Sequence, residues 1–434
     1  MVENTSESHC RMELLQCSVN VAYLKSLGLD SNVEYARREI IAEFEKAAPS
    51  SKSIDVSMPD FHGIDIHSQS NPHSDIELPE AFCQSAVAIQ FPEPQKRPDL
   101  SHIIFGVSTS VDRLEESLDQ FAHWASHSNA KFVVLLHAET ASPEAISRVE
   151  RKAAMFGIAL MFEQSDASFP DRYYSLTRMV YQMRDETTKW CAMIDDDTFF
   201  PSIAVLVDYL SGYDTSQPHY IGGLSEDFNQ VKAYGYMAYG GAGVFMTMPL
   251  LAQIDGNFDS CYSLQRGGDT RIAHCVHQHT LTKLVVHPRL HQLDMNGDLS
   301  GFYESGRPQP LSIHHWKSWH HANMTALAQV ASVCGDSCLL QRWRLNDGWF
   351  LTNGYSVMKP SGNLKEDDFT MEHTWNENGA YLHSVEPLRP KDDAKVSYKL
   401  EAAVAENEGN LVRQFYVKRS EGANRVLEIV WRQA

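Results

Sequence analysis

Three consecutive carboxylates are the residues of this sequence best suited to chemistry. Asp195, Asp196 and Asp197 follow directly on the apolar segment KWCAMI (189–194). Adjacent anions repel one another and raise one another's pKa unless a cation neutralises them. Oxygen-rich clusters of this kind suit Mg²⁺ or Mn²⁺, ions that also hold diphosphates. A solvated acidic loop is the alternative, because most runs of charge lie on surfaces. An apolar segment precedes the triplet and an aromatic helix is expected after it. With these neighbours, a functional role for the triplet is as well supported as a solvated loop.

Two glycine-rich segments could also approach a ligand. The run YGGAGVFM (239–246) places three glycines before a buried-looking strand, and glycine permits positive φ and close approach of the backbone. A loop or β-bulge without a ligand would have the same pattern. In RGGDT (266–270), Asp269 stands at the start of a helix expected near 269–280. Taken alone, Asp269 is expected to be the N-cap of that helix.

A histidine pair and two nearby cysteines leave a zinc site open as a further alternative. The segment LSIHHW (311–316) places His314 and His315 on an expected strand, and His320 and His321 follow closely. With Cys334 and Cys338 they could supply zinc ligands, as in a zinc protein or a metal-dependent hydrolase. The C-x₃-C spacing is not that of a zinc ribbon. The two cysteines are better explained as oxidised, either with each other or with distant partners.

The elements that must position these residues begin at residue 102. Short apolar segments alternate there with amphipathic ones, and four strands are predicted over 102–108, 131–137, 158–164 and 189–194. Helices are expected between them, the last over 171–186. Four such units predict a parallel sheet covered on both faces, with its ligand site beyond the carboxyl ends of the strands. The acidic triplet follows one of those ends.

The chain is expected to divide into an N-terminal helical or extended region (1–95), a central α/β domain (96–330) and a β-rich C-terminal extension (331–434). Leucine and valine spacing, followed by a charged run, predicts helix over 1–47. Asn353-Gly354 predicts a hairpin in the extension. Further strands are expected near 283–287, 311–315, 396–404, 411–418 and 425–431.

Composition excludes several classes of protein. The 434 residues include 37 Lys and Arg against 56 Asp and Glu, a net charge of −19, and 43% are hydrophobic. That hydrophobic fraction is too high for a disordered chain. An acidic surface repels phosphate backbones, which argues against a general nucleic-acid binder. The sequence contains no run of about 18 apolar residues, so no membrane span is predicted. The N-terminus lacks the features of a signal peptide.

Eight cysteines are too few for a disulfide scaffold in a chain of this length. Cys261 and Cys275 flank the loop that contains Asp269, and a disulfide between them would brace it. Two glycosylation sequons occur, at Asn4 and Asn323.

Four blocks together resemble the fringe-type β-1,3-glycosyltransferases, and most closely their fungal fringe-like branch. The blocks are DDDTFF, YGGAGVFM, GGDT and SIHH, in that order. The similarity covers roughly residues 100–320. It implies a GT-A (Rossmann-like) fold for the central domain, which would bind a UDP-sugar together with Mn²⁺ or Mg²⁺.

Carried over residue by residue, the resemblance implies roles for the acidic triplet and the first histidine. Asp197 corresponds to the main metal ligand and His314 to the later metal-ligand histidine. Asp195 is expected at the metal as well. Asp196 is expected close to the metal, the ribose or the sugar.

The resemblance also implies that Asp269 is the catalytic carboxylate, and that Gly241, Ala242 and Gly243 line the donor sugar. The family usually has two acidic residues before this helix, whereas this chain has Gly268-Asp269. Asp269 is therefore the only candidate there.

The opening segment VSTSVDRLEESLDQFAHW (107–124) resembles that of the family and adds Thr109 and Arg113 as candidates for donor binding. Arg172 is a further candidate for contact with the diphosphate, although a surface position would suit it equally.

The implied activity is inverting transfer of a hexose or N-acetylhexosamine from a UDP-sugar to a hydroxyl of a glycan or glycoprotein acceptor, forming a β-1,3 linkage. Asp269 would accept the proton of that hydroxyl. A non-catalytic relative that binds a sugar nucleotide or glycan is the alternative, because of the Gly268 departure. Members of the family mostly work in the Golgi lumen, so the Golgi lumen or secretion is expected, and Asn323 would then be glycosylated.

Overall fold

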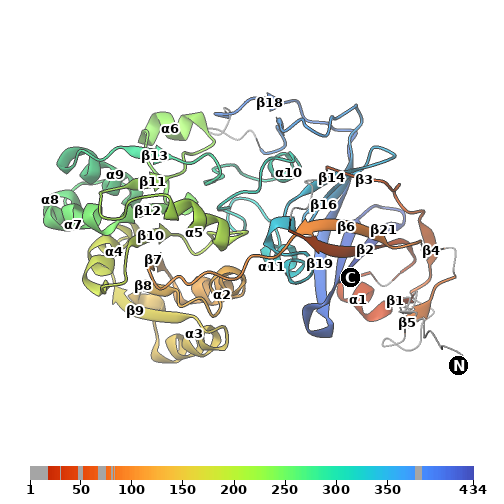
Figure 1. Cartoon of the computed structure of the whole chain (residues 1–434), viewed down its shortest axis with the longest axis horizontal. Coiled ribbons are helices and arrows are strands. Elements are labelled where there is room, and N and C mark those ends of the chain that lie inside the picture. Colours follow the sequence, from red (N-terminus) through yellow and green to blue (C-terminus); the bar gives the residue numbers. More distant parts are fainter. Residues whose placement is uncertain are drawn as a thin grey trace, which may run out of the picture.

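The computed structural model describes residues 18–29, 31–46, 52–66, 75–79, 82, 84–376 and 384–434. They form an α/β lobe and a β-rich lobe that lie side by side, with α11 (Met324–Gln329) between them (Figure 1). The sequon at Asn4 and the first part of the helix expected over 1–47 lie outside the described residues. Within the described ranges, no helix has the length and apolar character needed to cross a membrane.

A seven-stranded sheet forms the centre of the α/β lobe. In spatial order its strands are β13 (Leu284–Val286), β11 (Tyr220–Gly222), β12 (Val244–Thr247), β10 (Trp190–Ile194), β7 (Ile103–Thr109), β8 (Lys131–His137) and β9 (Ala159–Ser165). The strands from β10 to β9 are mutually parallel, whereas β12 runs antiparallel to both of its neighbours. The predicted α/β class, with parallel strands at the centre of the sheet, is confirmed.

Helices cover both faces of this sheet, as predicted. One face packs on α2 (Val111–Ala125), α3 (Pro143–Met155) and α5 (Ile203–Ser211). The other packs on α4 (Phe169–Met183), α7 (Met248–Gly256), α8 (Phe258–Tyr262) and α9 (Gly268–His279). Along β7, Ile103 and Phe105 belong to the first core and Ile104 to the second, the period-two alternation of a strand buried on both sides.

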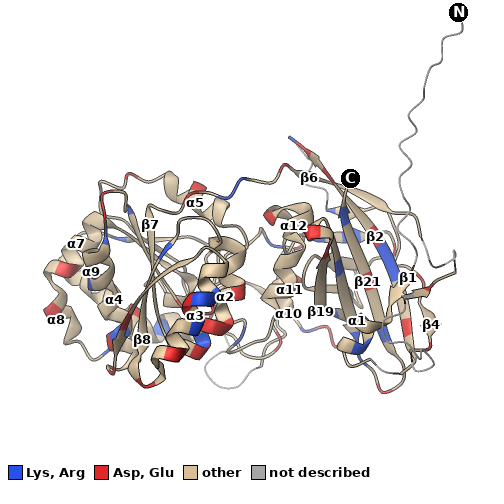
Figure 2. Cartoon of the chain, turned by 90° about the horizontal axis from the view of Figure 1, so that it is seen from below, with Lys and Arg blue, Asp and Glu red and all other residues tan. Residues whose placement is uncertain are grey.

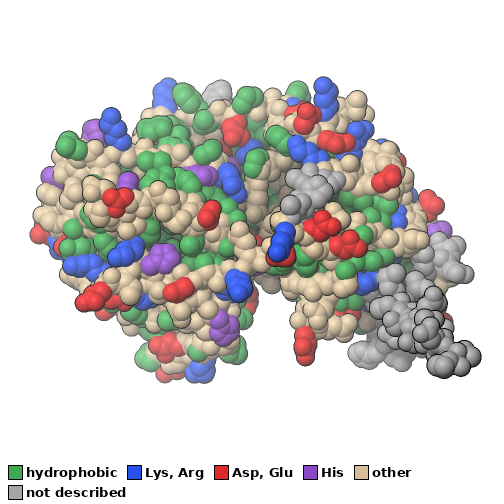
Figure 3. Space-filling view, in the orientation of Figure 1, with side chains coloured by type: hydrophobic (Ala, Val, Ile, Leu, Met, Phe, Trp, Pro, Cys, Tyr) green, Lys and Arg blue, Asp and Glu red, His purple; other side chains and the backbone are tan. Residues whose placement is uncertain are grey.

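The outward faces of α2 and α3 carry charges of both signs (Figure 2). Arg148 pairs with Glu115 at 2.8 Å and Lys152 with Asp119 at 2.9 Å. Acidic and basic side chains are likewise interspersed over the face seen in Figure 3. On the face shown, the acidic side chains are therefore not gathered in one patch.

A ten-stranded sheet forms the β-rich lobe. Nine of its strands follow one path: β3 (Ser53–Ile54), β14 (Arg342–Leu345), β15 (Phe350–Thr352), β16 (Ser356–Lys359), β19 (Val396–Glu406), β20 (Leu411–Lys418), β21 (Asn424–Gln433), β2 (Val33–Glu45) and β4 (His62–Ile64). The tenth, β6 (Val87–Pro92), also pairs with β2. The hairpin expected at Asn353-Gly354 joins β15 to β16, and Gly354 has the positive φ, +79°, that such a turn favours.

The remaining elements are short. They are β1 (Ser18–Asn20), α1 (Val21–Ser26), β5 (Asp75–Glu77), α6 (Phe228–Tyr234), α10 (Ser300–Tyr303), α12 (Ala331–Cys334), β17 (Met371–Glu372) and β18 (Leu388–Arg389).

Two expectations about elements are wrong. In the described part of 1–47 only α1 is an α-helix, and the charged run beyond it belongs to the strand β2. β2 pairs in parallel with β21 from Val33–Asn424 to Ala42–Gln433, so its partner lies far away in sequence. The strand expected over 311–315 is absent: Ile313 and Ser312 make only isolated bridges, to Phe199 and Leu290.

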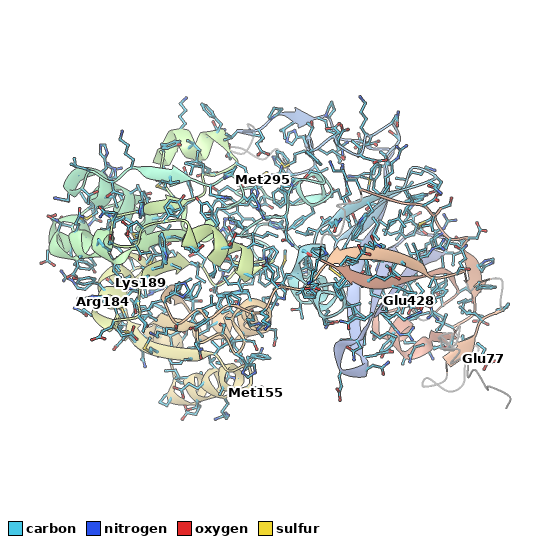
Figure 4. The ribbon with its side chains drawn as sticks, in the orientation of Figure 1. Glu77, Met155, Arg184, Lys189, Met295 and Glu428 are labelled. Carbon is cyan, nitrogen blue, oxygen red and sulfur yellow. A yellow bond between two sulfur atoms is a disulfide. The ribbon has the colours of Figure 1, made fainter. Side chains whose placement is uncertain are left out.

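Buried charge joins three strands of the β-rich lobe. Glu428 of β21, labelled in Figure 4, is 1% exposed and accepts a hydrogen bond of 2.7 Å from Arg413 Nη1 of β20. The Tyr35 hydroxyl of β2 donates to the same carboxylate. Strands from the first and last of the three expected regions thus share one sheet and one buried polar cluster.

Candidate active site

A cavity of about 670 Å³ opens beyond the carboxyl ends of the parallel strands. Thr109 lines it at the end of β7, His137 at the end of β8, and the acidic triplet after β10. This is the edge at which open α/β sheets bind their ligands. The cavity brings together the predicted site residues Thr109, Arg113, Arg172, Asp195, Asp196, Asp197 and His314.

Asp196, the middle residue of the triplet, is paired with the basic side chains of Arg113 and Lys317. It is 3% exposed and accepts hydrogen bonds from Arg113 Nε at 2.8 Å and Nη2 at 2.6 Å. The Thr109 hydroxyl donates to it as well, and Lys317 Nζ lies 3.5 Å away. Bidentate pairing of this kind is both strong and directional. Asp196 therefore orients Arg113 at the cavity wall.

His314 lies between the two outer carboxylates. Its Nε2 is 3.0 Å from Asp197 Oδ1 and 3.2 Å from Asp195 Oδ2. Its Nδ1 donates to the carbonyl oxygen of Gln292 at 3.1 Å, which leaves Nε2 directed at the carboxylates. Burial lowers the pKa of His314, but the charges of Asp197 and Asp195 outweigh it and raise that pKa well above 6.5. Burial would raise the pKa of Asp197, but His314 outweighs it and lowers that pKa.

These side chains fit a divalent cation. Asp195 Oδ1 is buried and has no hydrogen-bond partner among the described residues. Asp197, His314 and His315 each offer a ligand atom, and the three atoms lie within 4.8 Å of one another. Carboxylate and imidazole together are a donor set typical of transition-metal ions.

Arg172 is a buried cation on the cavity wall. It is 7% exposed, and its Nη1 donates to the carbonyl oxygen of Ala167 at 2.6 Å. Its Nε has no hydrogen-bond partner within the described ranges. A buried guanidinium whose described contact is a neutral carbonyl is suited to an anionic ligand.

The glycine loop supports His314 from behind. Gly240–Ala242 forms a 3₁₀ turn before β12. A Cβ on Gly241 would lie 2.0–2.2 Å from atoms of the His314 ring, so only glycine admits the ring there. Ala242 N donates at 2.9 Å to the side chain of Gln292, the residue whose carbonyl anchors His314. Gly241, Ala242 and Gly243 do not line the cavity described above, and their contact with a donor sugar stays a prediction.

Asp269 lies at the start of α9, across the glycine loop from the cavity. The N-cap of α9 is Gly267, so the N-cap interpretation of Asp269 is wrong. Its Oδ2 accepts from Gly240 N at 3.1 Å and its Oδ1 from Thr270 N at 2.7 Å. Burial raises the pKa of Asp269, and these two hydrogen bonds only partly oppose that rise. Asp269 does not line the cavity either, and its catalytic role stays a prediction.

Tyr173, which the sequence did not single out, explains the glycine before Asp269. A Cβ on Gly268 would lie 2.6–2.8 Å from atoms of the Tyr173 side chain, so an acidic residue does not fit there. The Tyr173 hydroxyl is buried and has no hydrogen-bond partner among the residues described. Burial first, and then the charges of Asp195 and Asp269, raise the pKa of Tyr173 well above 10. Tyr173 therefore stays protonated close to both carboxylates.

Three further residues support the outer carboxylates and the histidines. His315 Nε2 is 3.2 Å from Asp294 Oδ1, and its Nδ1 is 2.9 Å from the Ser318 hydroxyl. Ser318 Oγ donates to Asp197 Oδ2 at 2.8 Å. The doubled histidine is a signal in the sequence, whereas nothing in the sequence marks Asp294 or Ser318.

Two disulfides bear on the alternatives. Cys261–Cys275 joins α8 to α9, which carries Asp269, as expected, and Cys334–Cys338 closes a short loop. The second disulfide removes both cysteines as metal ligands, so a zinc site built on them is wrong.

Comparison with known proteins finds a partial family match. Residues 229–335 match the family described as "Protein of unknown function, DUF604", a segment that includes Asp269, His314 and His315. No curated protein matches the chain.

Solved structures match only distantly. The galactosyltransferase LgtC, in complex with donor and acceptor sugar analogs, is 12% identical, with a TM-score of 0.30 over 42% of this chain and 72% of its own. The 4-diphosphocytidyl-2C-methyl-D-erythritol synthase of Anaerococcus prevotii DSM 20548 is 8% identical, with a TM-score of 0.29 over 44% of this chain and 91% of its own. Likenesses this distant assign no function.

Proposed function

We propose that this chain is a divalent-metal-dependent glycosyltransferase. It moves a hexose or N-acetylhexosamine from a UDP-sugar to a hydroxyl of a glycan or glycoprotein acceptor, with inversion at the anomeric carbon and a β-1,3 linkage. The observation that carries the proposal is the pair Asp195 and Asp197 flanking His314 at the carboxyl edge of the sheet. The match of residues 229–335 to DUF604, which is related to fringe-like proteins, supports the same activity.

The charges of the cavity suit a nucleoside diphosphate. Arg172 offers a buried guanidinium with an unused Nε, and Arg113 is held at the wall by Asp196. The outer carboxylates would repel a diphosphate, and a divalent cation held by Asp195, Asp197 and His314 would offset that repulsion and stabilise the charge on the departing UDP. Without such a cation, His314 in its protonated form neutralises the same carboxylates.

Asp269 is the proposed base. Its carboxylate accepts the proton of the acceptor hydroxyl while that oxygen attacks the anomeric carbon from the face opposite the leaving UDP. A raised pKa suits this task because proton transfer is most effective when the pKa of the base lies near the working pH. Gly240 N and Thr270 N hold the carboxylate in place. No covalent intermediate is required, so the configuration inverts.

We further propose that the protein works in the secretory pathway, in the Golgi lumen or outside the cell. The disulfides Cys261–Cys275 and Cys334–Cys338 support an oxidising compartment, because cytosolic thiols are kept reduced.

A donor screen tests the activity. The full chain is incubated with UDP-Gal, UDP-Glc, UDP-GalNAc or UDP-GlcNAc, and release of UDP is measured with Mn²⁺ and with a chelator. Release is expected from one donor with Mn²⁺ and is lost with the chelator. Metal-dependent UDP binding without release from any donor, in the presence of a panel of glycan acceptors, would favour the non-catalytic alternative.

Two variants separate the proposed roles. Asp269→Asn is expected to lower kcat about 10²–10⁴-fold and to leave UDP binding with Mn²⁺ intact, because a lost general base affects the chemical step. Asp197→Ala is expected to weaken metal-dependent UDP binding more than about tenfold. Asp208→Ala, at an exposed position on α5, is the matched control and changes neither quantity. Loss of UDP binding in Asp269→Asn would mean that the role of Asp269 is wrong.

A further inference from the structure

The histidine after His314 is placed where an ordinary strand would not place it. Consecutive side chains of a strand point to opposite faces, yet the rings of His314 and His315 lie 3.7 Å apart between centroids. The backbone of His315 has φ +61°, in the left-handed region that non-glycine residues rarely adopt. Such a conformation is strained and persists where the surroundings enforce it, often at functional sites.

The His315 ring is held on both faces and at one nitrogen. Trp319 stacks on it in parallel, 4.2 Å between centroids and 6° between planes, and His314 covers the other side. Nε2 lies 3.2 Å from the buried carboxylate of Asp294, which is 4% exposed. Because the Asp294 carboxylate accepts a hydrogen bond from Nε2–H, the lone pair of the neutral ring lies on Nδ1, which contacts the Ser318 hydroxyl at 2.9 Å.

The two histidines are thus anchored in the same way. His314 donates Nδ1–H to Gln292 O and turns Nε2 toward Asp197, whereas His315 donates Nε2–H to Asp294 and turns Nδ1 toward Ser318. Ser318 in turn donates to Asp197 Oδ2 at 2.8 Å. In proteins, a histidine that binds a metal through one nitrogen commonly donates the other N–H to a carboxylate or a carbonyl.

We propose that His315 is a second imidazole ligand of the metal site, oriented by Asp294, and that the site therefore discriminates against Mg²⁺. The inference rests on the divalent cation of the proposed function and extends it to an additional ligand and a metal preference. Two imidazoles beside one or two carboxylates suit Co²⁺ or Zn²⁺ best and still bind Mn²⁺, whereas Mg²⁺ prefers oxygen ligands and an octahedral water shell.

The test counts nitrogen ligands directly. Pulsed electron paramagnetic resonance of Mn²⁺ bound to the full chain, with ¹⁵N-labelled histidine, is expected to detect two imidazole couplings. His315→Phe, which keeps a flat ring for Trp319 to stack on, is expected to leave one coupling and to lower the preference for Co²⁺ over Mg²⁺ by about tenfold or more, measured by titration. His315→Gln provides a second variant if the phenylalanine does not fold. A single coupling in the unaltered protein overturns the proposal.

Two further variants distinguish ligand from support. Asp294→Asn is expected to keep both couplings and to weaken Mn²⁺ binding about 10–100-fold, the effect usual for a group that orients a metal-bound histidine. His321→Phe, at an exposed position six residues on from His315, is the matched control and leaves the couplings and the affinity unchanged. Two couplings in His315→Phe would overturn the role of His315.

The outcome is separable from that of the proposed function, because Mn²⁺ binding is measured without a sugar donor. Two couplings in a protein that releases no UDP contradict the proposed function alone. One coupling in a protein that releases UDP contradicts the inference alone.

Discussion

At the scale of single residues, three chemically identical carboxylates have different surroundings, which separate their roles. Asp196 is paired with Arg113 and Lys317, whereas Asp195 and Asp197 face His314. The repulsion expected within the triplet is relieved by two different kinds of cation, one permanent and one that titrates. When His314 loses its proton, another positive charge must take the place of that proton between Asp195 and Asp197. This is the physical reason that a divalent ion fits there.

As the proposed base, Asp269 is expected to set the acid limit of the reaction. Burial raises its pKa above the ordinary value of 3.8, and the base must be ionised to accept a proton. As the pH falls through this raised pKa, kcat is therefore expected to decline, and the decline begins at a higher pH than an ordinary aspartate would allow. A pH profile of kcat under saturating donor and metal checks this. If the apparent pKa of the acid limb of this profile were at or below 3.8, the assignment of a buried Asp269 as the base would be wrong.

The residues that could be predicted from the sequence are those with a local signature. The acidic triplet follows an apolar strand, and His314 belongs to a recognisable block, so both could be found. Asp294 could not, because its role depends on a contact with His315 that is set by the backbone conformation at φ +61°. Tyr173 could not be predicted either, because α4 also contributes aromatic residues to the hydrophobic core and nothing in the sequence distinguishes Tyr173 from them.

At the scale of elements, the glycine loop determines where a histidine ring lies. Gly241→Ala is expected to displace the His314 ring, because the added Cβ would lie 2.0–2.2 Å from its atoms. Metal-dependent UDP binding should fall more than about tenfold, and overpacking should cost about 1–3 kcal/mol of unfolding free energy. Titration with Mn²⁺ and urea unfolding measure the two effects.

Gly256→Ala, at the end of α7, is the control for this substitution. A Cβ at Gly256 would meet nothing within 4 Å, so metal-dependent UDP binding should stay unchanged and the unfolding free energy should not fall. Normal metal binding by Gly241→Ala would show that the His314 ring can move without loss.

The strands and helices of the α/β lobe were predictable because the spacing of apolar residues within each segment indicates its type. β7, β8 and β10 are nearly continuous apolar runs, as strands buried on both faces must be, whereas β9 at the edge of the sheet is only partly buried. β2 was misassigned because its charged run follows leucines and valines at helical spacing and so is predicted as part of the same helix, while its partner β21 is almost 400 residues away. Pairing at that distance overrides local preference and leaves no local trace.

At the scale of the whole molecule, a buried ionic cluster joins the two lobes. Glu304, which follows α10, is fully buried and contacts Lys395 at 2.9 Å and Lys399 of β19 at 3.3 Å. Glu372 of β17, also fully buried, contacts Lys395 at 3.0 Å and Arg389 at 2.7 Å. Tyr303, beside Glu304, stacks on Tyr355 of the β-rich lobe at 4.3 Å between centroids and contacts His320 at 2.9 Å. The cluster thus holds the lobes together close to the histidine segment of the site.

The free energy of unfolding is expected to depend on Glu304, and the contribution of Glu304 is expected to depend on pH. Burial opposes ionisation of Glu304, but Lys399 and Lys395 outweigh it and hold its pKa below the ordinary value. Because the pKa is depressed in the folded state, the stabilisation is present above the unfolded pKa, about 4.3, and is lost as the pH falls through the folded value. Glu304→Gln should cost about 3–5 kcal/mol at neutral pH and flatten the acid side of a urea-unfolding profile.

The control is an exposed ion pair of the same lobe. Asp393 pairs with Lys391 at 3.4 Å, and both side chains are more than half exposed. Asp393→Asn should change the unfolding free energy by less than about 0.5 kcal/mol. An equally small effect for Glu304→Gln would mean that the cluster does not stabilise the contact between the lobes.

The pairing of β2 with β21 has a consequence for biosynthesis. The ribosome makes β2 about 390 residues before its parallel partner, with the whole α/β lobe encoded between them. At about 5–20 residues per second, β2 waits about 20–80 s before its ladder with β21 can close, and the backbone N–H and C=O groups of that strand edge stay unpaired during that time. The α/β lobe, whose strand–helix units are local, can fold in this interval. The unpaired edge of β2 is then the part of the nascent chain most exposed to pairing with another chain before β21 arrives.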